Sequence, residues 1–197
     1  MEYNIIIAGT GGQGTVLAGK LLSTPAIKKG LFARTSETIG MAQRGGSVTS
    51  HVRFSDNDDA VPSPILGQKT ADMLIAMELS ETVRVLPLLK DNGVVFTCNN
   101  AVFPTTGNYE PEEFLAYLKQ AAPNAFIADC KGFIEENGAK TLNVFLLGLA
   151  AASEELPFTA DELEEALREI IPAKFLEINL TAFSAGKEAY NHGKPQY

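Results

Sequence analysis

The sequence has few residues that could bind a metal. Cysteine occurs only twice, as Cys98 and Cys130, and the two lie far apart with no Cys-x-x-Cys pair. They cannot by themselves build an iron–sulfur cluster or a structural zinc site. Histidine also occurs only twice, as His51 and His192, and neither stands at a metal-ligand spacing from the other. The sequence therefore predicts no metal held by this chain.

A complete catalytic set is missing as well. No Ser-His-acid order with a nucleophile elbow is present. Cys130 follows a short predicted strand and could act as a nucleophile, but no base stands near it in the sequence. The sequence favours the alternative that Cys130 is simply a small buried or semi-buried residue. We therefore expect the chain not to be active as an enzyme alone.

Positive charge and long apolar runs are also in short supply. The chain carries 16 Lys and Arg against 24 Asp and Glu, a formal net charge of −8. This argues against a general nucleic-acid binder, which needs a basic face, and disfavours anionic membrane surfaces. The most apolar run, residues 144–152, is much shorter than the roughly 20 residues of a membrane helix, and no signal peptide is visible. We expect no nucleic-acid partner, no membrane and a cytoplasmic location.

Short apolar runs separated by helical patterns indicate the fold class. Residues 3–8, 72–77 and 94–98 read as buried strands, and helix-like segments lie between them. The pattern predicts an α/β protein: a three-layer α/β/α sandwich with a mostly parallel sheet and a Rossmann-like first strand-turn-helix. With 197 residues and no visible linker, we expect a single domain over residues 1–197.

Two local boundaries are predicted with less support from apolar periodicity. A second strand is expected over residues 31–35, followed by a polar loop that begins at Ser36. Farther along, Ser80 is the expected N-cap of a helix that reaches Lys90.

A glycine-rich turn follows the first predicted strand. Residues 9–14 read Gly-Thr-Gly-Gly-Gln-Gly, and the next helix would present free N–H groups to an anion there. Gly9, Gly11 and Gly14 match the dinucleotide spacing, so one hypothesis is an autonomous nucleotide (NAD-like)-binding protein that uses this turn. Glu37 comes late for the acidic residue that such a site requires. Alternatively, the glycines allow a tight turn packed on the sheet or on a partner.

A longer polar block begins at Ser36 and ends in a strand. Its Gly45-Gly46 pair offers backbone freedom and bare N–H groups, and Arg44 before it can fork onto a carboxylate or phosphate. Residues 48–54 then alternate as a strand, with Val48, Val52 and their even-numbered neighbours on one face. The block could equally be a solvated connection that ends in a Gly-Gly turn.

The two motifs together resemble the gamma subunit or domain of the 2-oxoacid:ferredoxin oxidoreductases, closest to the small (beta) subunit of the indolepyruvate branch. That family has a G-x-G-G-Q-G turn after its first strand and a block S-E-x-x-G-M-A-Q-R-G-G leading to H-V-R. Here the matching residues are Gly9, Gly11 to Gly14, Ser36, Glu37, Gly40 to Gly46, and His51 to Arg53. A looser likeness extends over most of the chain.

The resemblance implies a function that the chain shares with others. The family decarboxylates a 2-oxoacid oxidatively on thiamine diphosphate, with indolepyruvate, another arylpyruvate or a pyruvate-like acid as substrate. Electrons leave through iron–sulfur clusters to ferredoxin, and coenzyme A accepts the acyl group. A larger subunit would hold the thiamine diphosphate and the clusters, and this chain would pack against it.

The same resemblance implies which residues face the ligand or the partner. No catalytic residue is assigned. The expected cofactor-binding or partner-facing residues are Gly9, Gly11, Gly12, Gln13, Gly14, Ser36, Glu37, Gln43, Arg44, Gly45, Gly46 and Ser47.

Overall fold

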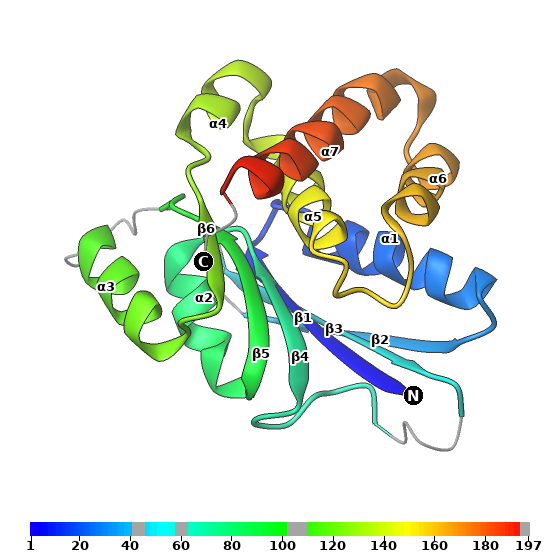
Figure 1. Cartoon of the computed structure of the whole chain (residues 1–197), viewed down its shortest axis with the longest axis horizontal. Coiled ribbons are helices and arrows are strands. Elements are labelled where there is room, and N and C mark those ends of the chain that lie inside the picture. Colours follow the sequence, from blue (N-terminus) through cyan, green and yellow to red (C-terminus); the bar gives the residue numbers. More distant parts are fainter. Residues whose placement is uncertain (41–45, 58–62, 102–109, 194–197) are drawn as a thin grey trace.

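A six-stranded sheet forms the middle layer of the molecule (Figure 1). The computed structural model describes residues 1–40, 46–57, 63–101 and 110–193. The sheet order is β2-β3-β1-β4-β5-β6; β3 runs antiparallel to β1 and β2, and the other pairings are parallel. The mostly parallel sheet is thus confirmed. The strands are β1 (Glu2–Thr10), β2 (Phe32–Ile39), β3 (Ser47–Ser55), β4 (Ala71–Ala76), β5 (Leu89–Cys98) and β6 (Ala125–Ala128).

Helices cover both faces of the sheet, which confirms the three-layer architecture (Figure 1). One face carries α1 (Thr15–Lys28), α5 (Leu142–Ala152), α6 (Ala160–Ile170) and α7 (Ala173–Gly193). The other carries α2 (Leu79–Val85) and α3 (Pro111–Ala121), while α4 (Lys131–Asn137) follows β6. Two short 3₁₀ turns complete the described elements, η2 (Leu86–Leu88) and η3 (Ala139–Thr141).

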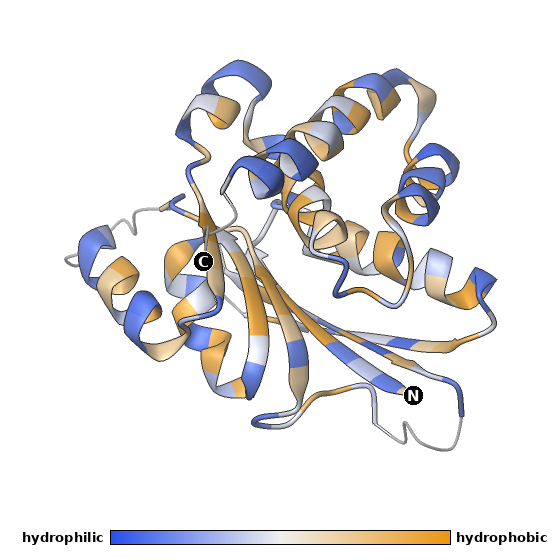
Figure 2. Ribbon diagram, in the orientation of Figure 1, coloured by the Kyte–Doolittle hydropathy of each residue, from blue (hydrophilic) through white to orange (hydrophobic). Residues whose placement is uncertain are grey.

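The alternation of side chains along β1 divides the interior into two cores. Ile5 and Ile7 point into the larger core under α1, α5 and α7, whereas Ile6 and Ala8 point into the smaller core on the α2 side. Figure 2 shows hydrophobic residues concentrated on the strands and on α5, with hydrophilic residues on the outer turns of the helices. Both faces of the central strands are therefore buried, as parallel strands require.

Helices α5 and α7 cross at very close range in the larger core. Their contact point is made of two glycines, Gly148 and Gly186. A Cβ atom on Gly148 would lie much closer than 3.0 Å to the Phe183 carbonyl oxygen. A Cβ atom on Gly186 would collide in the same way with the Phe145 carbonyl oxygen. The missing side chains allow the two backbones to touch, which seats the apolar α5 deep in the fold.

Both predicted ends of the helix that follows β4 were wrong. The helix expected to run from Ser80 to Lys90 ends at Val85, because Pro87 cannot donate a backbone hydrogen bond and the chain turns into β5. Its N-cap is Glu78 rather than Ser80: the Glu78 carboxylate accepts from the Glu81 backbone N–H at 2.8 Å.

The second strand is longer than predicted. β2 continues to Ile39 and pairs with β3 along its whole length, with Ser36 opposite His51. Ser36 and Glu37 therefore lie on a strand and not in the expected loop. The polar sequence of this segment has no apolar periodicity, so only its backbone pairing with β3 makes it a strand.

Candidate functional site

The glycine turn lies at the carboxyl end of β1, where the connections of the sheet diverge. From β1 the chain enters α1 on one face, and from the adjacent parallel strand β4 it enters α2 on the other face. Open α/β sheets bind their ligands at such a switch point, outside the carboxyl ends of the strands. The position of the turn makes this edge the candidate site.

A backbone hydrogen bond joins the two sequence motifs. The Gly11 N–H donates to the Gly46 carbonyl oxygen at 2.9 Å. Nearby, the Gly40 N–H donates to the Ser47 carbonyl oxygen at 2.7 Å and joins the residue after β2 to the first residue of β3. The glycine turn and the end of the polar block are thus neighbours in space although they are distant in sequence.

Much of the hydrogen-bonding capacity of the glycine turn is used inside the protein. The Gln13 side-chain oxygen accepts from the Thr10 N–H at 2.7 Å, and the Gln13 N–H donates to the Thr10 carbonyl at 3.1 Å. The Asn143 amide donates to the Gly14 carbonyl at 3.2 Å, which ties the turn to the start of α5. Gln13 was predicted to face a ligand or partner, yet its side-chain oxygen holds the turn closed.

The glycines of the turn differ in what surrounds them. Gly9 is buried under Gln13 and Met77, and Gly14 adopts a left-handed φ of 79° against the Asn143 amide. Gly11 and Gly12 are exposed, and a Cβ atom on Gly12 would meet nothing within 4 Å. Only the middle of the turn therefore presents bare backbone to an incoming group.

The arrangement of strands argues against a dinucleotide site. Such a site places its acidic residue at the end of the strand next to β1. Here β3 stands between β1 and β2, so Glu37 on β2 lies about 10 Å to the side, two strand spacings away. Nothing among the described residues supports the nucleotide-binding alternative.

The remaining site residues fall into two groups. Ser47, predicted to face a partner, donates its hydroxyl to the Glu81 carboxylate at 2.6 Å. Gln43, Arg44 and Gly45 lie outside the described residues, so their positions stay predictions. Glu81 itself was not anticipated, because its link to Ser47 joins two segments that no sequence motif connects.

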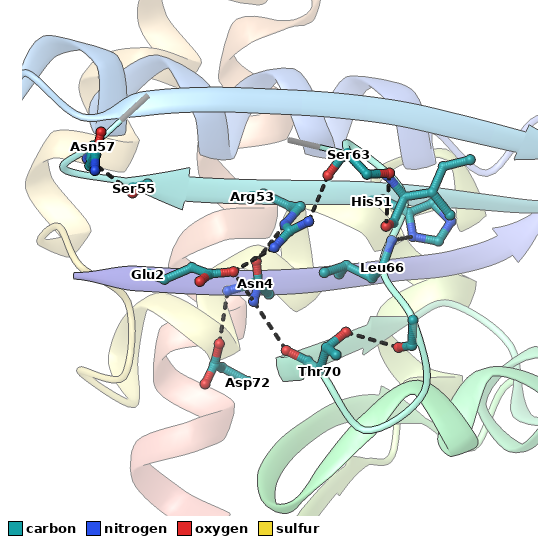
Figure 3. Close-up of polar contacts among 12 residues, drawn as sticks. Glu2, Asn4, His51, Arg53, Ser55, Asn57, Ser63, Leu66, Thr70 and Asp72 are labelled. Atoms are coloured by element: carbon teal, nitrogen blue, oxygen red, sulfur yellow. Dashed lines mark hydrogen bonds and ion pairs between the residues drawn. The ribbon is translucent and has the colours of Figure 1, made fainter. Parts of the chain in front are cut away.

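The His51–Arg53 end of the polar block has a structural role on the outer face of the sheet (Figure 3). The Arg53 guanidinium donates to the Asn4 side-chain oxygen at 3.0 Å and to the Ser63 carbonyl at 2.6 Å, and it pairs with Glu2. These contacts fasten the segment that begins at Ser63 across β3 and β1. This end of the motif therefore anchors the fold and lies away from the glycine turn.

His51 fastens the same segment by a second contact. Its Nδ1 accepts from the Leu66 backbone N–H at 3.2 Å, while its Nε2 lies 3.1 Å from the Thr38 hydroxyl (Figure 3 shows the first of these). An Nδ1 acceptor requires the neutral ring with its proton on Nε2. Burial lowers the pKa of His51 from its ordinary value, which favours this neutral form.

The two cysteines are buried at the ends of β5 and β6. A hydrogen bond with Cys98, reinforced by burial, raises the pKa of the Cys130 thiol. Cys130 is therefore a neutral thiol and a poor nucleophile, in keeping with the buried residue that the sequence favoured. Among the described residues, no group of three or more His, Cys, Asp or Glu could hold a metal ion.

Comparison with known proteins decides the family. Residues 4–189 match the family model described as pyruvate ferredoxin/flavodoxin oxidoreductase. The chain belongs to this oxidoreductase family. The predicted resemblance is thereby confirmed.

Relatives within the oxidoreductase family match over nearly the whole chain. The indolepyruvate oxidoreductase subunit IorB of Archaeoglobus fulgidus is 32% identical, over 99% of this chain and 98% of its own. IorB of Pyrococcus horikoshii is 34% identical, over 95% of this chain and 96% of its own. Both relatives are named as subunits, which implies that they belong to a multi-subunit oxidoreductase.

Solved structures share the fold of this family member. The keto/oxoacid ferredoxin oxidoreductase gamma subunit from Geobacter sulfurreducens has a TM-score of 0.70 at 24% identity, over 97% of this chain and 99% of that one. The 2-oxoglutarate:ferredoxin oxidoreductase from Magnetococcus marinus has a TM-score of 0.69 at 21% identity, over 97% of this chain but 31% of that one. The fold thus occurs both alone and as part of a longer chain. No helix among the described residues is long and apolar enough to cross a membrane.

Proposed function

We propose that this chain, as one domain over residues 1–197, is the small subunit of a cytoplasmic, thiamine-diphosphate-dependent 2-oxoacid:ferredoxin oxidoreductase. Its full-length likeness to IorB favours indolepyruvate or another arylpyruvate as substrate, ahead of a pyruvate-like acid. The observation that carries the proposal is the Gly11–Gly46 hydrogen bond, which joins the two motifs of the family at one edge of the sheet. Electrons would leave the assembled enzyme for ferredoxin.

The donor groups of this chain fit a supporting role. An iron–sulfur cluster requires several thiolates, whereas Cys98 and Cys130 are both buried and a raised pKa keeps Cys130 protonated. The described residues also offer no group of acidic ligands for a metal-bound diphosphate. The clusters and thiamine diphosphate would therefore be held by the larger subunit, and no step of the reaction is assigned to this chain.

The exposed middle of the glycine turn is suited to contact that larger subunit or its ligands. Gly11 and Gly12 present backbone at the carboxyl edge. Two apolar side chains near this edge are exposed, Val16 (52%) at the start of α1 and Ile39 (66%) at the end of β2. Exposed apolar groups beside a bare backbone are typical of a surface that a partner covers.

An anion such as coenzyme A is the second candidate for contact at this edge. The Magnetococcus marinus structure contains coenzyme A and succinyl-CoA. In this chain Arg44, a predicted site residue, would supply a positive charge, and the N–H groups at the start of α1 would supply hydrogen-bond donors. These residues would bind and orient the anion, while the acyl chemistry takes place on the larger subunit.

The proposal is tested by assembly with the larger subunit. The two chains would be co-expressed, and the complex assayed for dye reduction with indolepyruvate, pyruvate and 2-oxoisovalerate. Gly11→Leu adds a side chain at a position where a Cβ atom has open space, its nearest neighbour being the Gly46 oxygen at 3.8 Å. We expect this variant to fold normally and to lose at least tenfold in affinity for the larger subunit or in activity.

Two further variants complete that test. Arg44→Ala should weaken activity by raising the KM for coenzyme A, the anion proposed to contact Arg44. Gly132→Ala, in α4 with nothing near its Cβ position, is the matched control and should behave as the wild type. Failure of the wild-type chains to associate, or full activity of Gly11→Leu, would contradict the proposed function.

A further inference from the structure

A connected set of polar contacts joins the start of β3 to α2. The Ser47 hydroxyl donates to one Glu81 carboxylate oxygen at 2.6 Å, and Arg84 Nε donates to the other at 2.9 Å. Arg84 also donates to the Thr49 hydroxyl at 2.8 Å. Ser47 and Thr49 point to the same face of β3, so the set of contacts begins and ends on one strand. We call Ser47, Thr49, Glu81 and Arg84 the hairpin clamp.

The clamp attaches α2 to the strand that leaves the polar block. Glu81 is 6% exposed, so its carboxylate oxygens need hydrogen-bond partners within the protein. The backbone of Glu81 is also held in place, since its N–H donates to the Glu78 carboxylate that caps α2. A buried and oriented carboxylate thus meets the first residue of β3.

The clamp and the glycine turn hold opposite sides of the same short segment. Gly46 accepts the hydrogen bond from Gly11, and the next residue, Ser47, is held by Glu81. The Ser47 carbonyl also accepts from the Gly40 N–H, so Ser47 is held from the β2 side too. The clamp therefore fixes the position of Gly46, the last residue of the Gln-Arg-Gly-Gly sequence, and of Ser47 after it.

We infer that Glu81 and Arg84 are positioning residues of the proposed site: they hold Gly46 and Ser47 against the glycine turn, where this edge would meet its ligand or partner. This inference rests on the proposed function for its consequence in the assembled enzyme. No sequence motif marks either residue. Their contribution comes from contacts across the fold, and neither side chain needs to touch substrate.

The first test uses the isolated subunit, so it does not depend on the partner. Hydrogen exchange of the Gly11 and Gly40 amides reports the two backbone bonds that hold Gly46 and Ser47. Glu81→Gln keeps the size of the side chain and removes its charge, and Arg84→Met keeps its apolar stem. We expect each to speed exchange at Gly11 and Gly40 at least tenfold, while Ile6 and Ile7 in β1 keep their wild-type rates.

Matched variants separate positioning from general weakening. Arg168→Met removes a comparable arginine–glutamate pair, that with Glu164 within α6, and should leave the Gly11 and Gly40 rates unchanged. Ser47→Ala should reproduce the clamp variants, and Ser47→Thr, which keeps the hydroxyl, should restore slow exchange. Unchanged exchange in Glu81→Gln, Arg84→Met and Ser47→Ala would overturn the inference, as would acceleration spread equally over all amides of β1.

The second test uses the complex with the larger subunit. The clamp variants, like Arg44→Ala, should raise the KM for coenzyme A at least fivefold, with a smaller change in kcat. An equal loss of kcat at unchanged KM would overturn the positioning role. A wild-type chain that binds no larger subunit would refute the proposed function alone, because the exchange result on the isolated chain would stand.

Discussion

The two faces of the sheet are held by different kinds of interaction. On the α5 and α7 side, apolar side chains and two glycines bring backbone against backbone. On the outer side of β1 and β3, the segment from Ser63 is fastened by charged and polar groups centred on Arg53 and His51 (Figure 3). The first face depends on shape, whereas the β1–β3 part of the second face, beside the smaller apolar core, depends on hydrogen bonds and on protonation.

This difference shows which kind of change each face should resist. A close-packed face tolerates changes of pH but not added volume. A face held by a neutral imidazole and an arginine network tolerates small changes of volume but responds to charge. The carboxyl-edge site is tied to the packed face, since Asn143 of helix α5 donates to the carbonyl oxygen of Gly14 in the turn.

The largest effect is expected from added volume on the packed face. In Gly148→Ala the new methyl group would collide with the Phe183 carbonyl oxygen, so α5 and α7 must separate. We expect the free energy of unfolding to fall by about 3 kcal/mol or more. Urea denaturation of the isolated subunit measures this loss.

Gly132→Ala is the control for that substitution. It lies in α4 with no atom within 4 Å of its Cβ position, so alanine should stabilise the helix by up to about 1 kcal/mol. Equal stabilities of the Gly148→Ala variant and the wild type would show that the two helices are not held at this distance.

The sequence predicted the packed face better than the polar one. Continuous apolar runs such as residues 3–8 can only be buried, so strands and layers follow from them directly. The predicted second strand ended too early because Ser36 and Glu37 show no apolar periodicity. Its remaining residues are a strand only because they pair with β3, and a contact between segments is not visible in the local sequence. The early end of α2 at Val85 could have been predicted from Pro87 two residues later.

The next effect concerns the joint between the packed face and the candidate site. Gly14→Ala must adopt a φ of 79° and must also displace the Asn143 amide. Gly30→Ala has nearly the same φ, 82°, but nothing within 4 Å of its Cβ position. We expect about 1 kcal/mol of destabilisation at Gly30 and about 2 kcal/mol at Gly14.

Chemical denaturation of the two variants measures that difference directly. The excess at Gly14 isolates the contact with Asn143, because the backbone strain is common to both. If both substitutions cost the same, the tie between α5 and the glycine turn contributes nothing to stability.

The candidate site was predicted only in part. The two motifs were expected to act together, and the Gly11–Gly46 bond brings them together. The internal roles of Gln13 and Ser47 could not be foreseen, because the same side chains could bind a ligand equally well. Glu81 was missed because its partner, Ser47, is 34 residues away in the sequence.

The polar face should respond to acid. The folded state lowers the pKa of His51 from its ordinary 6.5, so neutral His51 contributes stability above that pH, and the contribution is lost as the pH falls through 6.5 toward the lowered value. Protonation removes the acceptor that binds the Leu66 N–H. The added slope is at most about 1.4 kcal/mol per pH unit for one proton.

Urea unfolding between pH 7.5 and 5.5 checks this sign. The wild type should lose more stability over this interval than His51→Gln, which keeps the exposed His192 and differs only at the buried ring. Parallel pH profiles for the two proteins would show that His51 does not act as the neutral acceptor.

The smallest effect concerns Ser50, a polar residue whose side chain lies in the apolar core. Ser50 follows Thr49 on β3 but points into the packed core, where its buried hydroxyl has no hydrogen-bond partner among the described residues. Ser50→Ala removes that hydroxyl and should stabilise the fold by up to about 1 kcal/mol, because an unpaired buried polar group costs free energy. Ser23→Ala is the matched control, since the buried Ser23 hydroxyl donates to the Gly19 carbonyl at 2.8 Å and gains nothing from removal. Thermal unfolding of both variants measures the difference, and a loss of stability in Ser50→Ala would mean that the packed face depends on a polar contact after all.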